Sequence, residues 1–245
     1  MVLWIDKLLA SVVRAGPARG IRFVRTRNGA DFSAGDYETP VQDVFQNTLR
    51  RGHVFLDIGA NLGFFSLLAA RLVGIEGRVY SFEPIPANLS IMRRNIALNR
   101  MSNITIVPKA ISSSCGVEGI WLTQHSGGAT MDTVGVVPAD ARGKLEVERT
   151  SVDEWMDSVG QPAVRMVKVD VEGAGMAVLN GMSRMLARFK PIVLVELDDP
   201  GVEGMTRKLS DFCEWCRSIG YKQERLANSY SNRHYQVAHV LAQSA

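Results

Sequence analysis

The stretch VFLDIGANLGFF, residues 54–65, leads from apolar residues into a carboxylate, two glycines and an asparagine. In open α/β sheets, ligands bind outside the carboxyl ends of strands, where a glycine-rich turn begins a helix. Gly59 and Gly63 would let the chain turn tightly and let a ligand approach the backbone, and Asn61 tolerates a left-handed conformation. Asp57, at the end of the strand, would accept hydrogen bonds from an ammonium group or from loop amides. The stretch therefore predicts a ligand-binding turn.

An acidic residue follows this turn at an interval typical of nucleoside binding. Glu83 ends the run RVYSFE, about twenty residues past Gly63, where an acidic residue on the second strand of a Rossmann-like sheet binds ribose hydroxyls. The spacing G-x-x-x-G, however, differs from the dinucleotide fingerprint G-x-G-x-x-G. A nucleoside with a cationic amino acid tail, S-adenosylmethionine, therefore fits better than a dinucleotide. An NAD(P)-dependent dehydrogenase stays open as the alternative enzyme, and a non-catalytic cofactor-binding protein as another class.

The elements that must position these residues alternate along the chain. From residue 53 onward, β-type runs and helical stretches of about ten to fifteen residues follow one another, which is typical of βαβ units on a mostly parallel sheet. The chain ends with a helix around residues 206–219 and two strands that favour an antiparallel hairpin at the sheet edge. The earlier elements are predicted, in order, at HVFLDI, LGFFSLLAARLV, RVYSF, PANLSIMRRNIALN, ITIVP, the capping-box helix of TSVDEWM, VRMVKVD, GMAVLNGMSRMLARF and PIVLVEL.

Two segments stand outside this alternation. Residues 112–150 lack helical periodicity and are rich in glycine, which predicts a β-rich insertion. Near the N-terminus, apolar residues at roughly helical spacing predict a short amphipathic helix that packs on the domain or on a partner subunit. We therefore divide the chain into a lead-in, residues 1–36, and one domain, residues 37–245. The residues that carry the N-terminal pattern are Leu3, Leu8, Leu9, Val12 and Val13.

Composition limits the classes of protein to which the chain can belong. With 245 residues, 46% of them hydrophobic, it can form one α/β domain with a full core. A net charge of +3 without a long basic block argues against nucleic acid, and Asp6 and Lys7 interrupt the N-terminal apolar run, which argues against a membrane span. Three cysteines are too few for a disulfide framework, so we expect a reducing, cytoplasmic location. Cys213 and Cys216 of CEWC lack a second ligand pair for zinc and are expected to be ordinary thiols.

Six segments follow one another along the chain: YETPVQDVF, VFLDIGANLGFFSLLAARLVG, GRVYSFEPIPANLSIMRRNIALN, TSVDEWM, VKVDVEGAGMAVLNGM and IVLVEL. In this order they resemble the FkbM family of S-adenosylmethionine-dependent methyltransferases. The resemblance covers roughly residues 37–197, and its most specific pieces are DIGANLG, FEP and KVDVEG. It implies an α/β fold of the Rossmann-like class I methyltransferase type: a seven-stranded, mostly parallel sheet with an antiparallel terminal hairpin and helices on both faces. It also implies methylation of a hydroxyl, commonly on a sugar or on a polyketide or glycolipid product.

The resemblance also implies which residues bind the cofactor. Residues of DIGAN would line its methionine end, Glu83 would meet the ribose, Pro84 the adenine edge, and Lys109 and Ala110 the adenine wall. With further positions in the quoted segments, the expected cofactor-binding set is Glu38, Asp57, Gly59, Ala60, Asn61, Gly63, Glu83, Pro84, Asn88, Lys109, Ala110 and Asp170.

Methyl transfer is an in-line displacement from a sulfonium, so the protein supplies alignment and electrostatics. A hydroxyl acceptor must still lose its proton. Asp170 and Glu172 follow the strand in VKVDVEG, and we expect Glu172 to orient or deprotonate the acceptor, with Asp170 nearer the cofactor. His125, in the glycine-rich QHSGGAT, is a second candidate base because an imidazole titrates near neutral pH.

Carboxylates after the next strand raise the question of a metal. Glu196, Asp198 and Asp199, together with Asp170, could gather a hard divalent cation. Clustered carboxylates of unknown geometry are weak evidence, so we assign no metal site from the sequence. The expected partner is a small-molecule hydroxyl acceptor that the sequence does not identify, and a homodimer through the N-terminal region or the insertion stays open.

Overall fold

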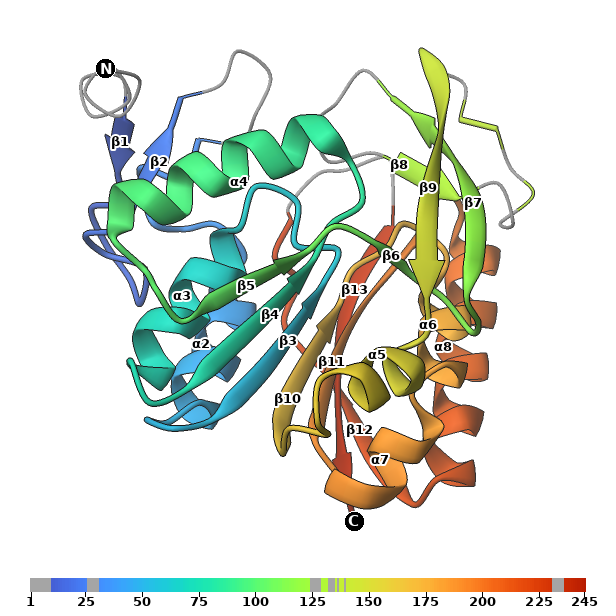
Figure 1. The fold of residues 1–245 in the computed structure, drawn as a ribbon. Coiled ribbons are helices and arrows are strands. Elements are labelled where there is room, and N and C mark those ends of the chain that lie inside the picture. The colour runs from blue at the N-terminus through green and yellow to red at the C-terminus, as the bar shows by residue number, and fades with distance from the viewer. Residues whose placement is uncertain are drawn as a thin grey trace.

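The computed structural model describes residues 10–25, 31–123, 129–131, 135, 137–138, 140–230 and 236–245. Its centre is a twisted seven-stranded sheet (Figure 1). Across the sheet the strands lie in the order β12 (Tyr221–Arg225), β13 (Gln236–Ser244), β11 (Ile192–Asp199), β10 (Val164–Val169), β3 (Val54–Ile58), β4 (Arg78–Phe82) and β5 (Ile104–Val107). The five strands from β11 to β5 are parallel, whereas β13 is antiparallel to both β11 and β12. The expected mostly parallel sheet with an antiparallel terminal hairpin is therefore confirmed.

Helices cover both faces of this sheet. Successive side chains of a strand point to opposite faces, and here both faces carry apolar residues that the helices bury. Met166 and Leu194 belong to the core on one face, whereas Val167 and Val195 belong to the core on the other. The first core also holds residues of α2 (Thr39–Thr48) and α3 (Phe64–Val73). The second holds residues of α5 (Val152–Ser158), α6 (Gly175–Asn180), α7 (Ser183–Phe189) and α8 (Val202–Ser218) (Figure 1). The predicted α/β architecture with helices on both faces is confirmed.

One expected helix is in fact two. The run GMAVLNGMSRMLARF forms α6 and α7, with a break at Gly181. A side chain at Gly181 would place its Cβ 2.1 Å from the carbonyl oxygen of Ser112, and the Gly181 carbonyl accepts a hydrogen bond from the amide of Asp153. The break thus comes from contacts with distant segments, which the local apolar pattern does not reveal.

The N-terminal helix prediction is wrong where the structure describes the segment, and residues 1–9 lie outside the described part. Ala10–Val12 form strand β1, which pairs antiparallel with β2 (Arg22–Val24). Two asparagines of α4 (Pro86–Asn99) hold β2: Asn95 Oδ1 accepts from the amide of Val24, and Asn99 Oδ1 accepts from the amide of Arg22. This tertiary pairing overrides the helical spacing of the apolar residues.

Residues 110–150 contribute a second, smaller sheet. Its strands lie in the order β6 (Ala110–Ile111), β9 (Gly143–Thr150), β7 (Gly116–Leu122) and β8 (Ala129–Met131). The segment predicted as β-rich therefore holds β7, β8 and β9. The capping box that follows is present, since Ser151 Oγ accepts from the amide of Glu154 and the Glu154 carboxylate accepts from the amide of Ser151. His125 lies outside the described residues.

The helix α8 carries both cysteines of CEWC. Cys216 is buried in the core, and Cys213 Sγ accepts hydrogen bonds from Arg217 and Gln223. Neither cysteine forms a disulfide in the described residues. Among the helices in the described ranges, none is both long enough and apolar enough to cross a membrane.

Candidate active site

The turn between β3 and α3 has the left-handed backbone that its sequence predicts. One of its glycines, however, is needed for close packing against another strand. Gly59, Asn61 and Gly63 all have positive φ angles, of 83°, 50° and 87°. A Cβ at Gly59 would lie 1.8 Å from the carbonyl oxygen of Asp170, so this glycine admits the end of β10. The amides of Gly59 and Ala60 donate to the Phe82 carbonyl at the end of β4. The turn is thus tied to both neighbouring strands and presents a fixed backbone at the carboxyl edge of the sheet.

Glu83 lies beside this turn, directly after β4. Its Oε2 accepts from the amide of Asn61 at 2.8 Å, and its Oε1 accepts from the amide of Ile85 at 2.8 Å and from Asn88 Nδ2 at 3.3 Å. The residue is 3% exposed, and burial raises its pKa to about 7 although these three donors oppose the shift. The expected side chains Glu83, Asn61 and Asn88 are therefore brought together.

The same contacts leave acceptor atoms for a nucleoside. A carboxylate oxygen has two lone pairs, so Glu83 Oε2, with one donor in the described structure, can accept a second hydrogen bond. Asn61 Oδ1 is buried and has no hydrogen-bond partner among the described residues. Both atoms suit a ligand that carries hydroxyl or amino donors, as the ribose and amino groups of S-adenosylmethionine do.

Asp57 accepts a hydrogen bond from a helix side chain, where the sequence predicted an ammonium group or loop amides as donors. It is 1% exposed, and its Oδ2 accepts a 2.5 Å hydrogen bond from Ser66 Oγ of α3, while Ser66 is also hydrogen-bonded to Ser81. Burial raises the pKa of Asp57 to about 6, opposed by the nearby charge of Lys168. In this structure the hydrogen bond of Asp57 connects β3 to α3, the two elements that flank the turn.

The expected adenine-side residues are spread more widely. Pro84 is half-buried and lies between Glu83 and α4 in the chain, whereas Ala110 is buried in β6 within the core of the small sheet. Lys109 forms an ion pair with Glu148 of β9, with 2.9 Å between Nζ and Oε2 and both side chains substantially exposed. The described structure therefore directs the Lys109 ammonium to the small sheet.

Asp170 and Glu172 follow β10, as expected. Asp170 Oδ2 lies 2.7 Å from Lys168 Nζ, and Glu172 is half-buried with a φ of 43°. The next residue, Gly173, donates its amide to Asp198 Oδ1. A left-handed backbone at a glutamate is uncommon and often marks a functional turn.

The carboxylates considered for a metal are not gathered together. Asp198 accepts from the Gly173 amide, whereas Asp199 accepts from the Gly201 amide and pairs with Lys208 at 3.3 Å. Glu196 instead lies close to two residues that the sequence did not connect with it.

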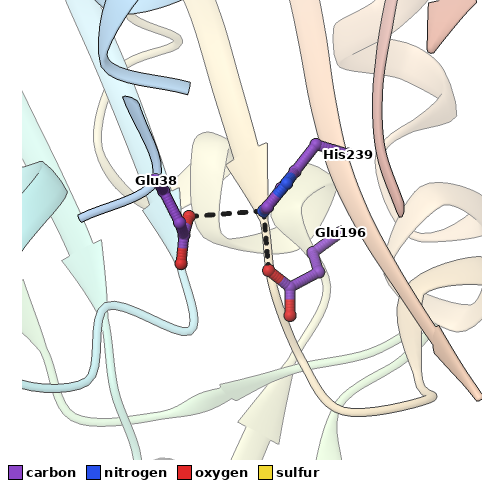
Figure 2. Close-up of side chains that lie close together, drawn as sticks. All are labelled: Glu38, Glu196 and His239. Carbon is purple, nitrogen blue, oxygen red and sulfur yellow. Dashed lines mark ion pairs between the residues drawn. The ribbon is translucent and has the colours of Figure 1, made fainter. Parts of the chain in front are cut away.

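Glu196 meets Glu38 and His239 (Figure 2). His239 faces Glu196 across the β11–β13 ladder, and Glu38 is the residue before α2. His239 Nε2 lies 2.7 Å from Glu196 Oε2 and 3.3 Å from Glu38 Oε2. Tyr230 donates its hydroxyl to Glu38 Oε1, and Ser229 Oγ lies 3.2 Å from His239 Nδ1. Glu38, expected to bind the cofactor, is thus part of a buried charged cluster.

Lys168 connects this cluster to the turn. It pairs across the β3–β10 ladder with Asp57, and its ammonium lies 4.9 Å from the centre of the Phe65 ring. Burial would lower its pKa, but Asp170, Glu38, Asp57 and Glu196 together hold the pKa above its usual value. Lys168 is therefore a buried cation that serves several carboxylates at once.

These carboxylates and the imidazole titrate differently. Although burial opposes it, His239 and Lys168 lower the pKa of Glu38 to about 2. Burial and the charge of Asp170 raise the pKa of Glu196 to about 7. Burial would lower the pKa of His239, but Glu196 and Glu38 raise it to about 9. Such divergent values in one cluster are characteristic of functional sites.

Sequence reasoning missed Lys168, His239 and Tyr230. A signal for two of them was present, since Lys168 and His239 interrupt otherwise apolar strands, where an ionisable group is costly unless it is paired. Their common partners, however, come from distant parts of the chain. Strand register pairs Glu196 with His239 and Asp57 with Lys168, and the start of α2 adds Glu38.

Relatives of this chain with known names are methyltransferases. Methyltransferase sdnD of Sordaria araneosa is 28% identical over 59% of this chain and 66% of its own length, just under two thirds. The 31-O-demethyl-FK506 methyltransferase FkbM of Streptomyces tacrolimicus is 26% identical over 66% of this chain and 76% of its own. The hexuronic acid methyltransferase AglP of Haloferax volcanii is 27% identical over 69% and 68%.

Solved structures show the same fold. Methyltransferase FkbM from Methylobacillus flagellatus matches with a TM-score of 0.53 and 17% identity, over 88% of this chain and 56% of that one. A Streptococcus mutans protein in complex with SAH matches with a TM-score of 0.52 and 9% identity, over 84% and 96%. The fold is that of class I methyltransferases. The Methyltransferase FkbM domain matches residues 57–223, more than half of the chain. With the cofactor-type turn in place, the chain belongs to the FkbM family of S-adenosylmethionine-dependent methyltransferases.

Proposed function

We propose that the protein is an O-methyltransferase that methylates a hydroxyl of a small molecule, on a sugar moiety or on a natural product of the glycoside, glycolipid or polyketide type. Two relatives support this acceptor class, one named for an oxygen of FK506 and the other for a hexuronic acid. Neither name identifies the acceptor of this chain. The side chains of the site support the cofactor and the proton transfer that this reaction needs.

The observation that carries the proposal is the position of Glu83. Its carboxylate is fixed by the Asn61 and Ile85 amides, and Oε2 keeps a lone pair at the carboxyl edge of the sheet. Glu83 would accept the ribose hydroxyls, and Asn61 Oδ1 would accept a hydrogen bond from an amino group. When bound, S-adenosylmethionine supplies an electrophilic methyl group on a sulfonium. The protein's task is to align this methyl group with the acceptor.

The residues after β10 complete the proposal. Lys168 holds the Asp170 carboxylate at 2.7 Å, and we assign Asp170 the task of orienting the bound molecules. Glu172, half-buried and held in a left-handed turn, is the proposed proton acceptor for the hydroxyl. A general base of this kind contributes about 10²- to 10⁴-fold in rate. We expect Glu172→Gln to lower kcat by that order and to leave the affinity for S-adenosylhomocysteine unchanged.

The direct test is transfer of labelled methyl from S-adenosylmethionine to a panel of acceptors. The panel holds glycosides with and without a hexuronic acid and macrocyclic polyketides with a free hydroxyl. Treatment of the product with mild base separates a stable methyl ether from a labile methyl ester. The proposal predicts a base-stable product, lost in Glu83→Gln and retained in the exposed control Glu76→Gln. Label that mild base releases, or label on an amine, would show another acceptor group.

A further inference from the structure

Three ligand-type atoms converge between α2, β11 and β13. They are Glu38 Oε2, Glu196 Oε2 and His239 Nε2, which all lie within 4.8 Å of one another (Figure 2). Glu38 and His239 are 2% and 3% exposed, so their polar atoms are shielded from water. The proposed function assigns none of these atoms to the donor or to the acceptor.

The three atoms form ion-pair contacts, yet these contacts lack hydrogen-bond geometry. The distances from His239 Nε2 to the carboxylate oxygens are 2.7 and 3.3 Å, but within the described ranges none of the three atoms has a partner in hydrogen-bond geometry. Buried polar atoms are nearly always satisfied, because an unsatisfied one costs about 1–3 kcal/mol. An atom placed between all three would satisfy them together.

The other atoms of these side chains are already engaged. Glu38 Oε1 accepts from Tyr230, and His239 Nδ1 lies within hydrogen-bond distance of Ser229. These contacts fix the orientation of the carboxylate and of the ring and leave Oε2 and Nε2 toward the common centre. Metal-binding histidines and carboxylates are characteristically oriented by outer hydrogen bonds of this kind.

Charge favours a cation at this place. Lys168 interacts with Asp57, Asp170, Glu38 and Glu196, so one ammonium serves four carboxylates. Once a cation displaces the imidazole proton of His239, the four carboxylates and the one ammonium leave an excess of negative charge in a buried region. A divalent cation would offset most of it.

We propose that Glu38, Glu196 and His239 form a site for one divalent transition-metal cation. A nitrogen ligand disfavours Mg²⁺ and Ca²⁺, whereas two carboxylates and one imidazole suit Mn²⁺ or Zn²⁺. Ligands about 2.0–2.2 Å from one ion can lie up to about 4.4 Å apart, so small side-chain adjustments bring all three atoms to one centre. Three protein ligands leave further coordination positions for water or for an oxygen of a small molecule.

The test is calorimetric titration of the metal-stripped full chain with Mn²⁺ and with Zn²⁺, with metal content checked by elemental analysis. We expect one equivalent to bind, and Glu196→Gln and His239→Ala each to weaken binding by at least tenfold. His53→Ala, which removes a histidine outside the cluster, should bind like the unaltered protein. Circular dichroism verifies that each variant is folded, and the near-isosteric Glu196→Gln keeps the test valid if His239→Ala fails to fold.

Two results would overturn the proposal. The first is no binding of either ion by the unaltered protein, which would leave a proton shared among the three side chains as the occupant. The second is equal binding by the unaltered protein, Glu196→Gln and His239→Ala, which would place the ion elsewhere. Because methyl transfer and cofactor binding play no part in this titration, its failure is separate from any failure of the proposed function.

Discussion

Glu83 illustrates how one buried residue links cofactor affinity to pH. Its burial raises the pKa to about 7, and its ionised form is the one that accepts ribose hydroxyls. The raised pKa also means that its contribution to folding stability is present below about pH 4.5 and is lost as the pH rises through about 7. Binding and stability should therefore respond to pH in opposite directions at this residue.

We expect the affinity for S-adenosylhomocysteine to rise about tenfold between pH 6 and pH 8, as Glu83 loses its proton. Titration calorimetry at several pH values measures this change. Glu83→Gln should bind weakly and with little pH dependence. An equal rise in Glu83→Gln would assign the effect to another group.

Lys168 is the residue on which the charge balance of the site depends. Lys168→Met keeps most of the side-chain volume but leaves Asp57, Asp170, Glu38 and Glu196 without this buried cation. Removal of one partner from a buried pair costs about 3–5 kcal/mol, and we expect a loss of free energy of unfolding in that range near pH 7.5. The loss should shrink at pH 5, where more of the carboxylates are protonated.

Urea denaturation at the two pH values measures the effect of Lys168→Met. Lys222→Met, on an exposed position of β12, is the matched control and should change stability by less than about 0.5 kcal/mol. A loss for Lys168→Met as small as that of the control would contradict the role given to the buried ammonium.

At the scale of elements, the site depends on how closely the β3–α3 turn approaches the end of β10. Gly59→Ala would bring a Cβ within 1.8 Å of the Asp170 carbonyl, so one of the two segments must move. We expect a loss of more than about 2 kcal/mol of stability, since backbone strain and overpacking add, together with weaker S-adenosylhomocysteine binding.

Gly52 provides the control for this substitution. It has the same φ of 83°, but a Cβ there would meet nothing within 4 Å. Gly52→Ala should therefore cost only the conformational strain, about 1–2 kcal/mol, and leave binding unchanged. Chemical denaturation and cofactor titration of both variants separate strain from steric contact, and equal effects would refute the close approach.

Elements with a local signal were predictable from the sequence. The parallel strands are apolar runs, and the helix at Val152 begins with a capping box that the structure contains. Elements whose conformation depends on distant contacts were not predictable. The break at Gly181 depends on Ser112, and the β1–β2 pairing is held by Asn95 of α4, so local spacing alone predicted a longer helix and an N-terminal helix instead.

The same distinction applies to the site at the scale of the whole molecule. Glu83 and the glycine turn were predictable, because both lie on one βαβ unit with a known spacing. The meeting of Glu38, Glu196 and His239 was not, because these residues come from the start of α2, from β11 and from the terminal hairpin. Their meeting depends on the register of β13 against β11, in which Glu196 faces His239. A shift of one residue would turn His239 to the opposite face.

The sheet order explains why these separate parts form one functional edge. β10, β3 and β4 lie next to one another and are parallel, so their carboxyl ends share one edge, and β13 lies beside β11 (Figure 1). In the β11–β13 register, His239 faces Glu196. Lys168 therefore connects the nucleoside-binding turn to the charged cluster. It lies opposite Asp57 in the β3–β10 ladder, and its ammonium interacts electrostatically with Glu38 and Glu196. A charged ligand at the nucleoside-binding turn should therefore change the electrostatic potential at the charged cluster.

The central claim is that this edge binds S-adenosylmethionine and not a dinucleotide. Calorimetric titration of the full chain with S-adenosylhomocysteine, NAD and NADP, each in turn, tests it most directly. The account predicts that S-adenosylhomocysteine binds with a stoichiometry of one and that neither dinucleotide does. Binding of NAD or NADP, or no binding of S-adenosylhomocysteine, would contradict it.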